Sequence, residues 1–150
     1  MIKKNLQKNE NNKSIFSFFL FLFFFIFIFF TSHVKADDIS ACGTLSANTE
    51  YYLTNDVNAT GTCFTLGGNN IVLDCRGYNI NYSSSTTGYA ITGSGKSNIT
   101  IRNCKIWQTG TPSSSHAIYF GTSTASRANI TNTTIYTRGS SCYGIYLYNF

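Results

Sequence analysis

Carboxylates are the first candidates for chemistry in this chain. A calcium site takes about six to eight oxygen ligands, often from several carboxylates, and glycoside hydrolysis uses a pair of them. Only five acidic residues follow residue 36, and among them only Asp74 lies within the repeated part of the chain described below. We therefore predict no catalytic residue and no metal site, and we interpret Asp74 as a turn-forming residue.

Two further patterns resemble active-site motifs but lack essential parts. His116 follows the serines at positions 113–115, yet no aspartate or nucleophile motif accompanies it, which argues against a catalytic triad. Residues 93–97, Gly-Ser-Gly-Lys-Ser, resemble a phosphate-binding loop but lack its full spacing and the helix that follows it. A turn explains this segment better, so no cofactor is predicted.

Aromatic and basic side chains indicate a binding surface. Tyr119 and Tyr146 alternate with aliphatic residues and should point outward, one above the other; with Trp107 they offer rings on which sugars could stack. Arg76 and Lys105 should align as an exposed basic stripe suited to an acidic sugar. Outward aromatic ladders also stabilise sheets, and surface charges are commonly only solvated, so both alternatives stay open. The predicted partner is a polysaccharide or a cell-envelope glycan, with Tyr136, Tyr143 and Tyr148 as further aromatic candidates.

After residue 36, five asparagines stand in Asn-x-Ser/Thr sequons, the acceptor sequence for N-linked glycans. They are Asn58, Asn81, Asn98, Asn129 and Asn132. At Asn98 and Asn129 the sequence Asn-Ile-Thr is also the signature of a repeated strand, so a structural role is the alternative there.

The elements that must position these residues begin after an export signal. Residues 1–13 carry four lysines, and residues 15–30 are apolar except for Ser17. A Val-x-Ala triplet then ends at Ala36, which completes the pattern of a secretory signal peptide, residues 1–36. An uncleaved anchor is the alternative, because Phe-rich helices can span a bilayer with fewer residues than usual. A membrane is expected as a partner only in that case.

Charge excludes one class of partner. The whole chain has a net charge of +5, but six basic and five acidic residues remain after residue 36, a net charge of +1. No basic patch of the kind that binds phosphate backbones is left, so nucleic acid is not expected.

All five cysteines lie in the exported part, where disulfides persist. They are Cys42, Cys63, Cys75, Cys104 and Cys142. Two disulfides and one free thiol can be paired in several ways that sequence alone does not distinguish. The odd cysteine can stay free, bond another molecule or bond a residue further along the chain. Metal binding is disfavoured, because neither Cys-x-x-Cys nor paired Cys/His spacing occurs.

A repeat organises the exported part. Phe64, Ile91, Ile118 and Ile145 follow one another at intervals of 27 residues. A second strand pattern follows each of the first three anchors and begins at Asn70, Asn98 and Asn129; a third recurs at Ile80, Ile106 and Ile135. Each repeat should therefore hold three short strands separated by Gly/Ser/Asn-rich turns. The predicted core ladder consists of Phe64, Ile91, Ile118 and Ile145, with Ile71, Ile99 and Ile130 from the second strands.

Three short strands cannot bury a core in a single layer, but stacked repeats can. The sequence thus predicts an all-β solenoid, a right-handed parallel β-helix with about one coil of three short strands per 27-residue repeat. Hexapeptide repeats, which are typical of left-handed β-helices, are absent. The asparagines before the second strands should form a ladder at a sharp corner, because Asn tolerates the left-handed backbone conformation. A β-sandwich is the alternative, but it would not explain the fixed period.

Residues 37–62 precede the first repeat and are predicted to form an N-terminal cap, because an open solenoid end exposes unpaired strand edges. Residues 63–150 are predicted to form coils that are incomplete at the C-terminus, with further coils expected beyond residue 150.

Residues 62–66, 70–80 and 98–106 resemble repeats of the pectate-lyase-like right-handed β-helix superfamily, in particular secreted and surface β-helix proteins of archaea and bacteria. That superfamily includes lyases, hydrolases, adhesins and other envelope proteins, so the resemblance implies a fold and a secreted or cell-surface location rather than one activity. A scaffold or adhesive module that binds glycans is the function expected. The alternative is the N-terminal part of a carbohydrate-active enzyme, a polysaccharide lyase or glycoside hydrolase, whose catalytic coils lie downstream.

Overall fold

The computed structural model describes residues 35–121 and 127–148. In these ranges the chain forms fourteen strands, and no helix in them is long and apolar enough to cross a membrane. The predicted signal segment lies outside the described residues except for Lys35 and Ala36, which begin β1. The strands are β1 (Lys35–Ile39), β2 (Gly43–Leu45), β3 (Thr49–Leu53), β4 (Val57–Asn58), β5 (Phe64–Leu66), β6 (Ile71–Asp74), β7 (Asn79–Tyr82), β8 (Ile91–Thr92), β9 (Ile99–Arg102), β10 (Lys105–Gln108), β11 (Ile118–Gly121), β12 (Ala128–Thr131), β13 (Thr134–Tyr136) and β14 (Ile145–Tyr148).

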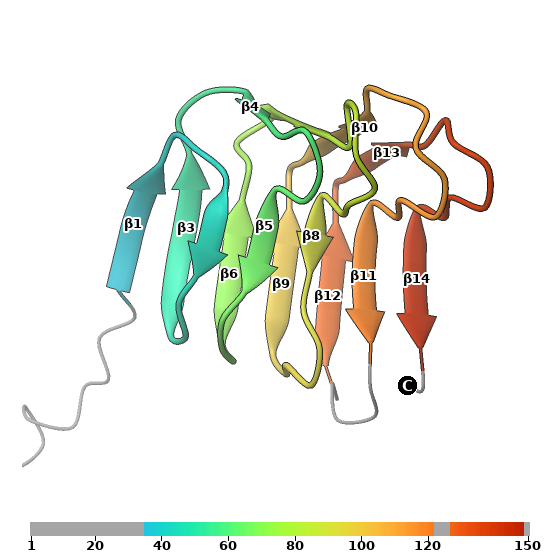
Figure 1. The fold of residues 1–150 in the computed structure, drawn as a ribbon. Coiled ribbons are helices and arrows are strands. Elements are labelled where there is room, and N and C mark those ends of the chain that lie inside the picture. The colour runs from blue at the N-terminus through green and yellow to red at the C-terminus, as the bar shows by residue number, and fades with distance from the viewer. Residues whose placement is uncertain (1–34, 122–126, 149–150) are drawn as a thin grey trace, which may run out of the picture. The chain divides into compact units, whose positions relative to one another are not determined.

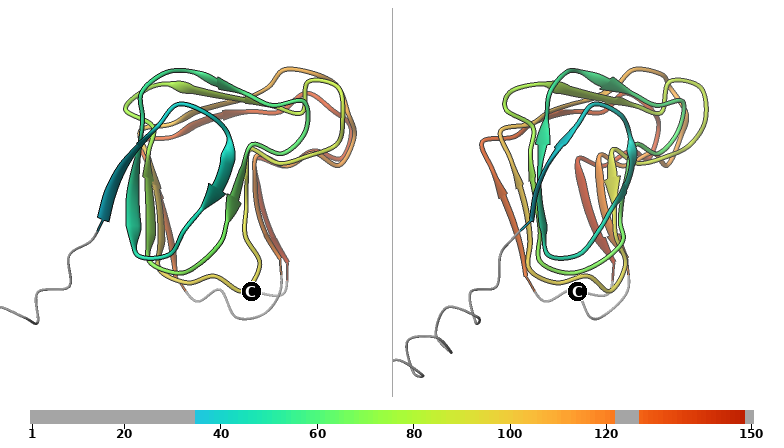
Figure 2. Two further views of the ribbon diagram at one scale, coloured as in Figure 1. Left: turned by 60° about the vertical axis from the view of Figure 1, so that its left-hand side comes forward. Right: turned by 90° about the vertical axis from the view of Figure 1, so that its left-hand side faces the viewer.

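These strands form three sheets in which all neighbours are parallel (Figure 1). The strand orders are β1-β3-β6-β9-β12, β13-β10-β7-β4 and β14-β11-β8-β5-β2. From β2 onward, successive strands of the chain enter the three sheets in a fixed rotation, so the chain returns to each sheet at every third strand. The views in Figure 2 show successive windings lying over one another. The result is a solenoid-like parallel β fold, as the repeat predicts.

The 27-residue period of the sequence gives the strand register in the sheet β14-β11-β8-β5-β2. Phe64 pairs with Ile91, Ile91 with Ile118, and Ile118 with Ile145. Phe64, Ile91 and Ile118 are fully buried, so their predicted place in the core is confirmed. Ile145 occupies the expected register but is 46% exposed. Its strand β14 pairs only with β11 among the described strands, which leaves one side of Ile145 uncovered.

One predicted equivalence is wrong by two residues. Ile71 pairs with Ile99 as predicted, but the residue paired with Ile99 in the next coil is Ala128, and Ile130 pairs with Ile101. Strand side chains alternate with a period of two, so a two-residue shift keeps Ile130 on the inward face. Ile130 therefore packs against the core, but in the ladder of Ile101 rather than that of Ile99.

Asparagines form the predicted corner ladder before the second strands. Asn48, Asn70 and Asn98 have φ values of 56°, 57° and 57°, in the left-handed region. Asn98 Nδ2 donates to Asn70 Oδ1 at 2.9 Å, and Asn70 Nδ2 donates to Asn48 Oδ1 at 2.7 Å. The prediction is confirmed for Asn70 and Asn98. It is wrong for Asn129, which lies inside β12 opposite Thr100 and has no positive φ.

Two disulfides join strands that are neighbours in a sheet. Cys42 bonds Cys63 just before β2 and β5, and Cys75 bonds Cys104 just after β6 and β9. Cys142 is a free, half-buried thiol. This selects one pairing from those that the sequence leaves open, and such disulfides are typical of proteins in oxidising compartments.

The segment predicted as a cap, residues 37–62, carries coil strands. It contributes β2, β3 and β4 to the three sheets, and β1 pairs with β3 on the side opposite β6. Gly43 pairs with Phe64, 21 residues later rather than 27, so this shorter coil lies outside the sequence period.

Candidate functional site

The outer face of the sheet β4-β7-β10-β13 carries two neighbouring exposed rings with a cationic side chain on either side. Ile80, Ile106 and Ile135 pair with one another and face the core, as their predicted recurrence requires. Strand alternation therefore turns the next residues outward. These are Asn58, Asn81, Trp107 and Tyr136, which pair in one continuous row.

Trp107 and Tyr136 form an aromatic pair at the centre of this face. Their ring centroids are 5.4 Å apart and their planes are tilted by 46°. Trp107 is 37% exposed and Tyr136 is 49% exposed, so both rings keep surface open to solvent. We call the outward side chains of β7, β10 and β13 around this pair the Trp107 face.

The Trp107 face is hollowed. A groove of about 370 Å³ is lined by Asn79, Asn81, Trp107, Gln108, Thr109, Tyr136 and Arg138. The Arg138 guanidinium donates weakly to the Thr109 carbonyl at 3.4 Å and forms no ion pair with a described carboxylate. The groove thus combines two rings, amide groups and one cation that has no acidic partner among the residues described.

Lys105 supplies a second cation, two residues before Trp107 on the same strand. It is exposed and forms no ion pair with a described carboxylate. A second hollow of about 450 Å³ lies at this corner, with Arg76, Gly77, Asn103, Cys104, Lys105, Asn132 and Thr134 in its lining. Cations therefore lie on both sides of the aromatic pair along the strand direction.

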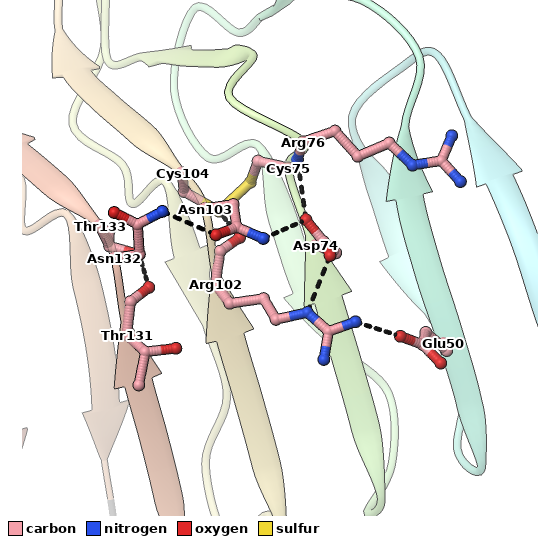
Figure 3. A network of polar contacts seen from close by, with 10 residues as sticks. All are labelled: Glu50, Asp74, Cys75, Arg76, Arg102, Asn103, Cys104, Thr131, Asn132 and Thr133. Carbon is pink, nitrogen blue, oxygen red and sulfur yellow. Dashed lines mark hydrogen bonds and ion pairs between the residues drawn. A yellow bond between two sulfur atoms is a disulfide. The ribbon is translucent and has the colours of Figure 1, made fainter.

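The predicted alignment of Arg76 with Lys105 is wrong. Lys105 pairs with Asn79, because the turn after β6 is longer than the turn after β9. The two residues share the lining of the corner hollow, but the Arg76 guanidinium turns toward β3 and β1 (Figure 3). It lies 4.1 Å from the Tyr52 ring centroid and 3.3 Å from Asp38, so its charge is already engaged.

A polar network on the sheet β1-β3-β6-β9-β12 was not predicted (Figure 3). Arg102 bonds Asp74 on the neighbouring strand and Glu50 one strand further on. Asp74 also accepts from the backbone N–H of Arg76 and from Asn103 Nδ2, each at 2.9 Å.

This network holds Asp74 as an ionised acceptor. Burial is the largest influence on its pKa and raises it, but the donors from Arg102, Asn103 and Arg76 together outweigh burial and lower the pKa below its ordinary value. A carboxylate with these bonds cannot serve as a proton donor near neutral pH. The bond to the Arg76 N–H is the turn-forming role expected of Asp74.

A second set of rings lies on the sheet β14-β11-β8-β5-β2. Tyr119 and Tyr146 pair in register and stack outward with centroids 5.7 Å apart and planes 6° apart, as predicted. His116 stacks on Tyr146 at 4.6 Å, and Tyr89 stacks on Tyr119 at 4.6 Å. Because these rings cover one another's faces, they leave less ring surface for a sugar than Trp107 does. This geometry favours the alternative role, an aromatic ladder that stabilises the sheet.

His116 is the central ring of that ladder. It is 8% exposed, and its Nδ1 accepts the backbone N–H of Tyr143 at 3.1 Å. Burial lowers the pKa of His116. Tyr89, His116 and Tyr143 recur at the 27-residue period, a signal in the sequence that identifies the ladder once the period is known.

The five sequons separate into two groups. The side-chain nitrogens of Asn81, Asn98 and Asn132 donate to asparagine oxygens of the preceding coil at 2.9, 2.9 and 2.8 Å. Asn58 and Asn129 are exposed, and their side-chain nitrogens donate to no described residue. Three predicted acceptors thus donate within ladders, Asn58 only accepts from Asn81, and Asn129 makes no ladder bond among the described residues.

No family model, curated protein or solved structure matches this chain. In addition, the described residues contain no group of three His, Cys, Asp or Glu side chains that could hold a metal ion. Functional inference therefore depends on the geometry of the surfaces described above.

Proposed function

We propose that this chain is an extracytoplasmic β-helix module that binds a glycan, with preference for acidic chains, on the Trp107 face. The observation that carries the proposal is the exposed Trp107–Tyr136 pair, with Lys105 on one side and Arg138 on the other. The finer fold assignment is a right-handed β-helix of the pectate-lyase-like type, supported by three parallel sheets and asparagine corners.

Exposed rings next to amides suit sugars for a physical reason. One face of a pyranose presents C–H groups, which pack on the electron-rich face of an aromatic ring, while its hydroxyls need polar partners at the edge. Asn81 and Thr109 line the same groove as Trp107 and provide such partners. The groove is open and shallow, which suits a chain of sugars better than a single enclosed molecule.

Charge sets the preference for acidic chains. Lys105 and Arg138 are separated by about four extended residues, or roughly 13 Å along the strand direction. No described carboxylate pairs with either side chain. Carboxylate or sulfate groups on a bound polysaccharide would meet these cations at both ends of the aromatic pair, at a strength that falls with ionic strength.

Two features support the proposed location. A chain with an export signal reaches a compartment where disulfides persist, and the structure contains Cys42–Cys63 and Cys75–Cys104. Polysaccharides are abundant ligands on that side of a membrane. The module would then act as a scaffold or adhesive element at the cell surface or outside it.

A glycan array probed with the purified protein tests this proposal. We expect signal on acidic polysaccharides, strong loss with Trp107→Ala and Tyr136→Ala, and partial loss with Lys105→Ala or Arg138→Ala. Tyr148→Ala is the matched control, because Tyr148 is equally exposed at 50% but lies on another sheet. Equal signal for Trp107→Ala and the parent protein, or no signal from any glycan, would overturn the proposal. Shortening of a bound polysaccharide would instead favour a carbohydrate-active enzyme.

A further inference from the structure

A series of hydrogen bonds runs along one exposed edge of the Trp107 face and links three neighbouring coils. Trp107 Nε1 donates to Asn79 Oδ1 at 3.1 Å. Asn79 Nδ2 donates to Asp56 Oδ2 at 2.7 Å, and the backbone N–H of Asn79 donates to Asp56 Oδ1 at 2.8 Å. The three residues belong to successive coils, because Asp56 directly precedes β4 while Asn79 and Lys105 are paired on β7 and β10.

Asp56 fixes which group donates and which accepts in this series of hydrogen bonds. An asparagine amide carries a donor on one side and an acceptor on the other, and rotation by half a turn exchanges them. The Asp56 carboxylate is only an acceptor when ionised, so it selects the orientation in which Asn79 Nδ2 faces Asp56. Asn79 Oδ1 then faces Trp107 and accepts its indole N–H.

We propose that Asp56 is a positioning residue for the Trp107 face: acting through Asn79, it fixes the rotamer of Trp107 and occupies the indole N–H. This inference rests on the proposed function, because it assigns a role to Asp56 in binding at that face. Asp56 itself lies two coils away from Trp107 and contacts the ring only through Asn79.

The ionised state of Asp56 is favoured where it lies. The backbone and side-chain donors of Asn79 lower the pKa of Asp56, with a further contribution from the charge of Lys105. Asp56 therefore remains a double acceptor over the neutral pH range, and the orientation of the amide does not alternate.

The same hydrogen bonds restrict the contacts that Trp107 can make with a ligand. Its only hydrogen-bond donor is already used by Asn79, so the indole contributes ring surface and no polar contact. A sugar bound there must place a C–H face on Trp107 and direct its hydroxyls toward the other polar groups of the groove. Glycans whose sugars expose a continuous apolar face are therefore the ones selected.

Trp107 provides a direct readout, because it is the one tryptophan of the chain. Its emission, its quenching by acrylamide and its anisotropy decay can be followed in the ligand-free protein, with excitation at wavelengths where tyrosine does not absorb. For Asp56→Ala and Asn79→Leu we expect faster local motion of the ring and easier quenching. Asp56→Asn should give an intermediate result, because its amide keeps one acceptor oxygen but adds a donor that no longer fixes the orientation of Asn79.

Asp38→Ala is the control, since Asp38 is also an exposed acid but lies in β1, on another sheet, and pairs with Arg76. Thermal unfolding of every variant, followed by circular dichroism, confirms that the measurements are made on folded protein. Unchanged Trp107 motion and quenching in both Asp56→Ala and Asn79→Leu would overturn the inference.

Binding separates this inference from the proposed function. With an acidic polysaccharide identified on the array, we expect Asp56→Ala to weaken binding about tenfold, equivalent to about 1.4 kcal/mol. If Trp107 motion changes but no glycan binds even the parent protein, the proposed function fails while the positioning role stands. If the parent binds and Asp56→Ala binds equally well with a more mobile ring, the role in binding fails and the proposed function stands.

Discussion

Arg102 reaches across a whole strand to Glu50. Its Nη2 lies 2.6 Å from Glu50 Oε1 on β3, while its Nε lies 2.8 Å from Asp74 on the intervening β6 (Figure 3). One side chain therefore ties three coils together on the outer surface, in addition to their backbone pairing and the Cys75–Cys104 disulfide.

Replacing Arg102 should destabilise the coils more than replacing its outer partner. Arg102→Gln leaves Asp74 largely buried without its charged donor, and we expect a loss of about 1–3 kcal/mol in the free energy of unfolding. Glu50→Gln removes only the more exposed ion pair and should cost less than about 1 kcal/mol. Urea unfolding followed by circular dichroism measures both values. Equal losses would contradict the central role of Asp74 in the network.

The network also predicts a dependence on acid. The pKa of Asp74 is lower in the folded protein than in the unfolded chain, so its contribution is complete above the unfolded value of about 3.9 and is lost as the pH falls through the folded value. We therefore expect the stability difference between the parent and Asp74→Asn to shrink as the pH falls below about 4.

A third prediction concerns the corner ladder at Asn70. This residue has a φ of 57° and makes two side-chain bonds, to Asn48 and from Asn98. Asn70→Ala loses both bonds. Alanine also lacks the polar side chain that lets asparagine adopt the left-handed conformation, so its backbone there costs about 1–2 kcal/mol. Asn70→Gly loses the bonds but relieves the backbone, so it should be the more stable variant by about 1 kcal/mol. An alanine variant as stable as the glycine variant would show that the bonds, rather than the backbone, determine the choice of asparagine.

The repeat made part of this architecture predictable from sequence. Phe64, Ile91 and Ile118 recur at a fixed period because the coils that they anchor have equal length, and that period locates the strands of one sheet correctly. The prediction paired Ile130 with Ile99 rather than with Ile101. Inward and outward side chains alternate every two residues, so this alternation is unchanged when a strand shifts by two residues.

The polar sites were harder to predict for a related reason. Glu50 lies in the coil of 21 residues, outside the recognised period, so nothing in the sequence aligned it with Asp74 or Arg102. The recurrence of Ile80 and Ile106 gives the register of β7 with β10, but Trp107 bonds Asn79 rather than its paired residue Asn81, and the strand pattern does not contain that choice. Turn and coil lengths limited the prediction of the network, and the direction of a side chain limited that of the Trp107 face.

The ladders predict which sequons accept a glycan in a host that performs N-linked glycosylation. Asn58 and Asn129 should be modified, because both are exposed and their side-chain nitrogens donate to no described residue. Asn98 and Asn132 should stay unmodified, because each donates its side-chain N–H groups to the preceding coil and occupies a left-handed corner that a bulky substituent would disrupt. Site-resolved mass spectrometry of the secreted protein measures occupancy.

Sequon-disrupting variants give the control for that measurement. Thr60→Val and Thr131→Val remove the acceptor sequence of Asn58 and Asn129 but keep each asparagine, so they should abolish modification at that site without altering the ladders. High occupancy at Asn98 in folded, secreted protein would contradict the placement of its amide in a ladder.

The final prediction is that His116 makes the stability of the described coils sensitive to mild acid. Its Nδ1 accepts the Tyr143 N–H, and burial lowers its pKa in the folded protein below the unfolded value of about 6.5. The folded state therefore binds fewer protons than the unfolded chain below that pH. Stability that is complete above about 6.5 is lost as the pH falls through the folded pKa of His116.

His116→Phe isolates this effect. Phenylalanine keeps a ring in the stack with Tyr119 and Tyr146 but has no nitrogen to protonate, and it sacrifices the bond from Tyr143 at every pH. We expect the variant to be less stable than the parent at neutral pH by about 0.5–1.5 kcal/mol, and to lose less stability between neutral and mildly acidic pH. Thermal unfolding of both proteins across that range measures the two slopes. Carboxylates titrate at lower pH, so a difference between the two slopes reports on His116. Equal slopes of stability against pH for the two proteins would contradict the prediction, because burial would then not penalise the charged form of His116.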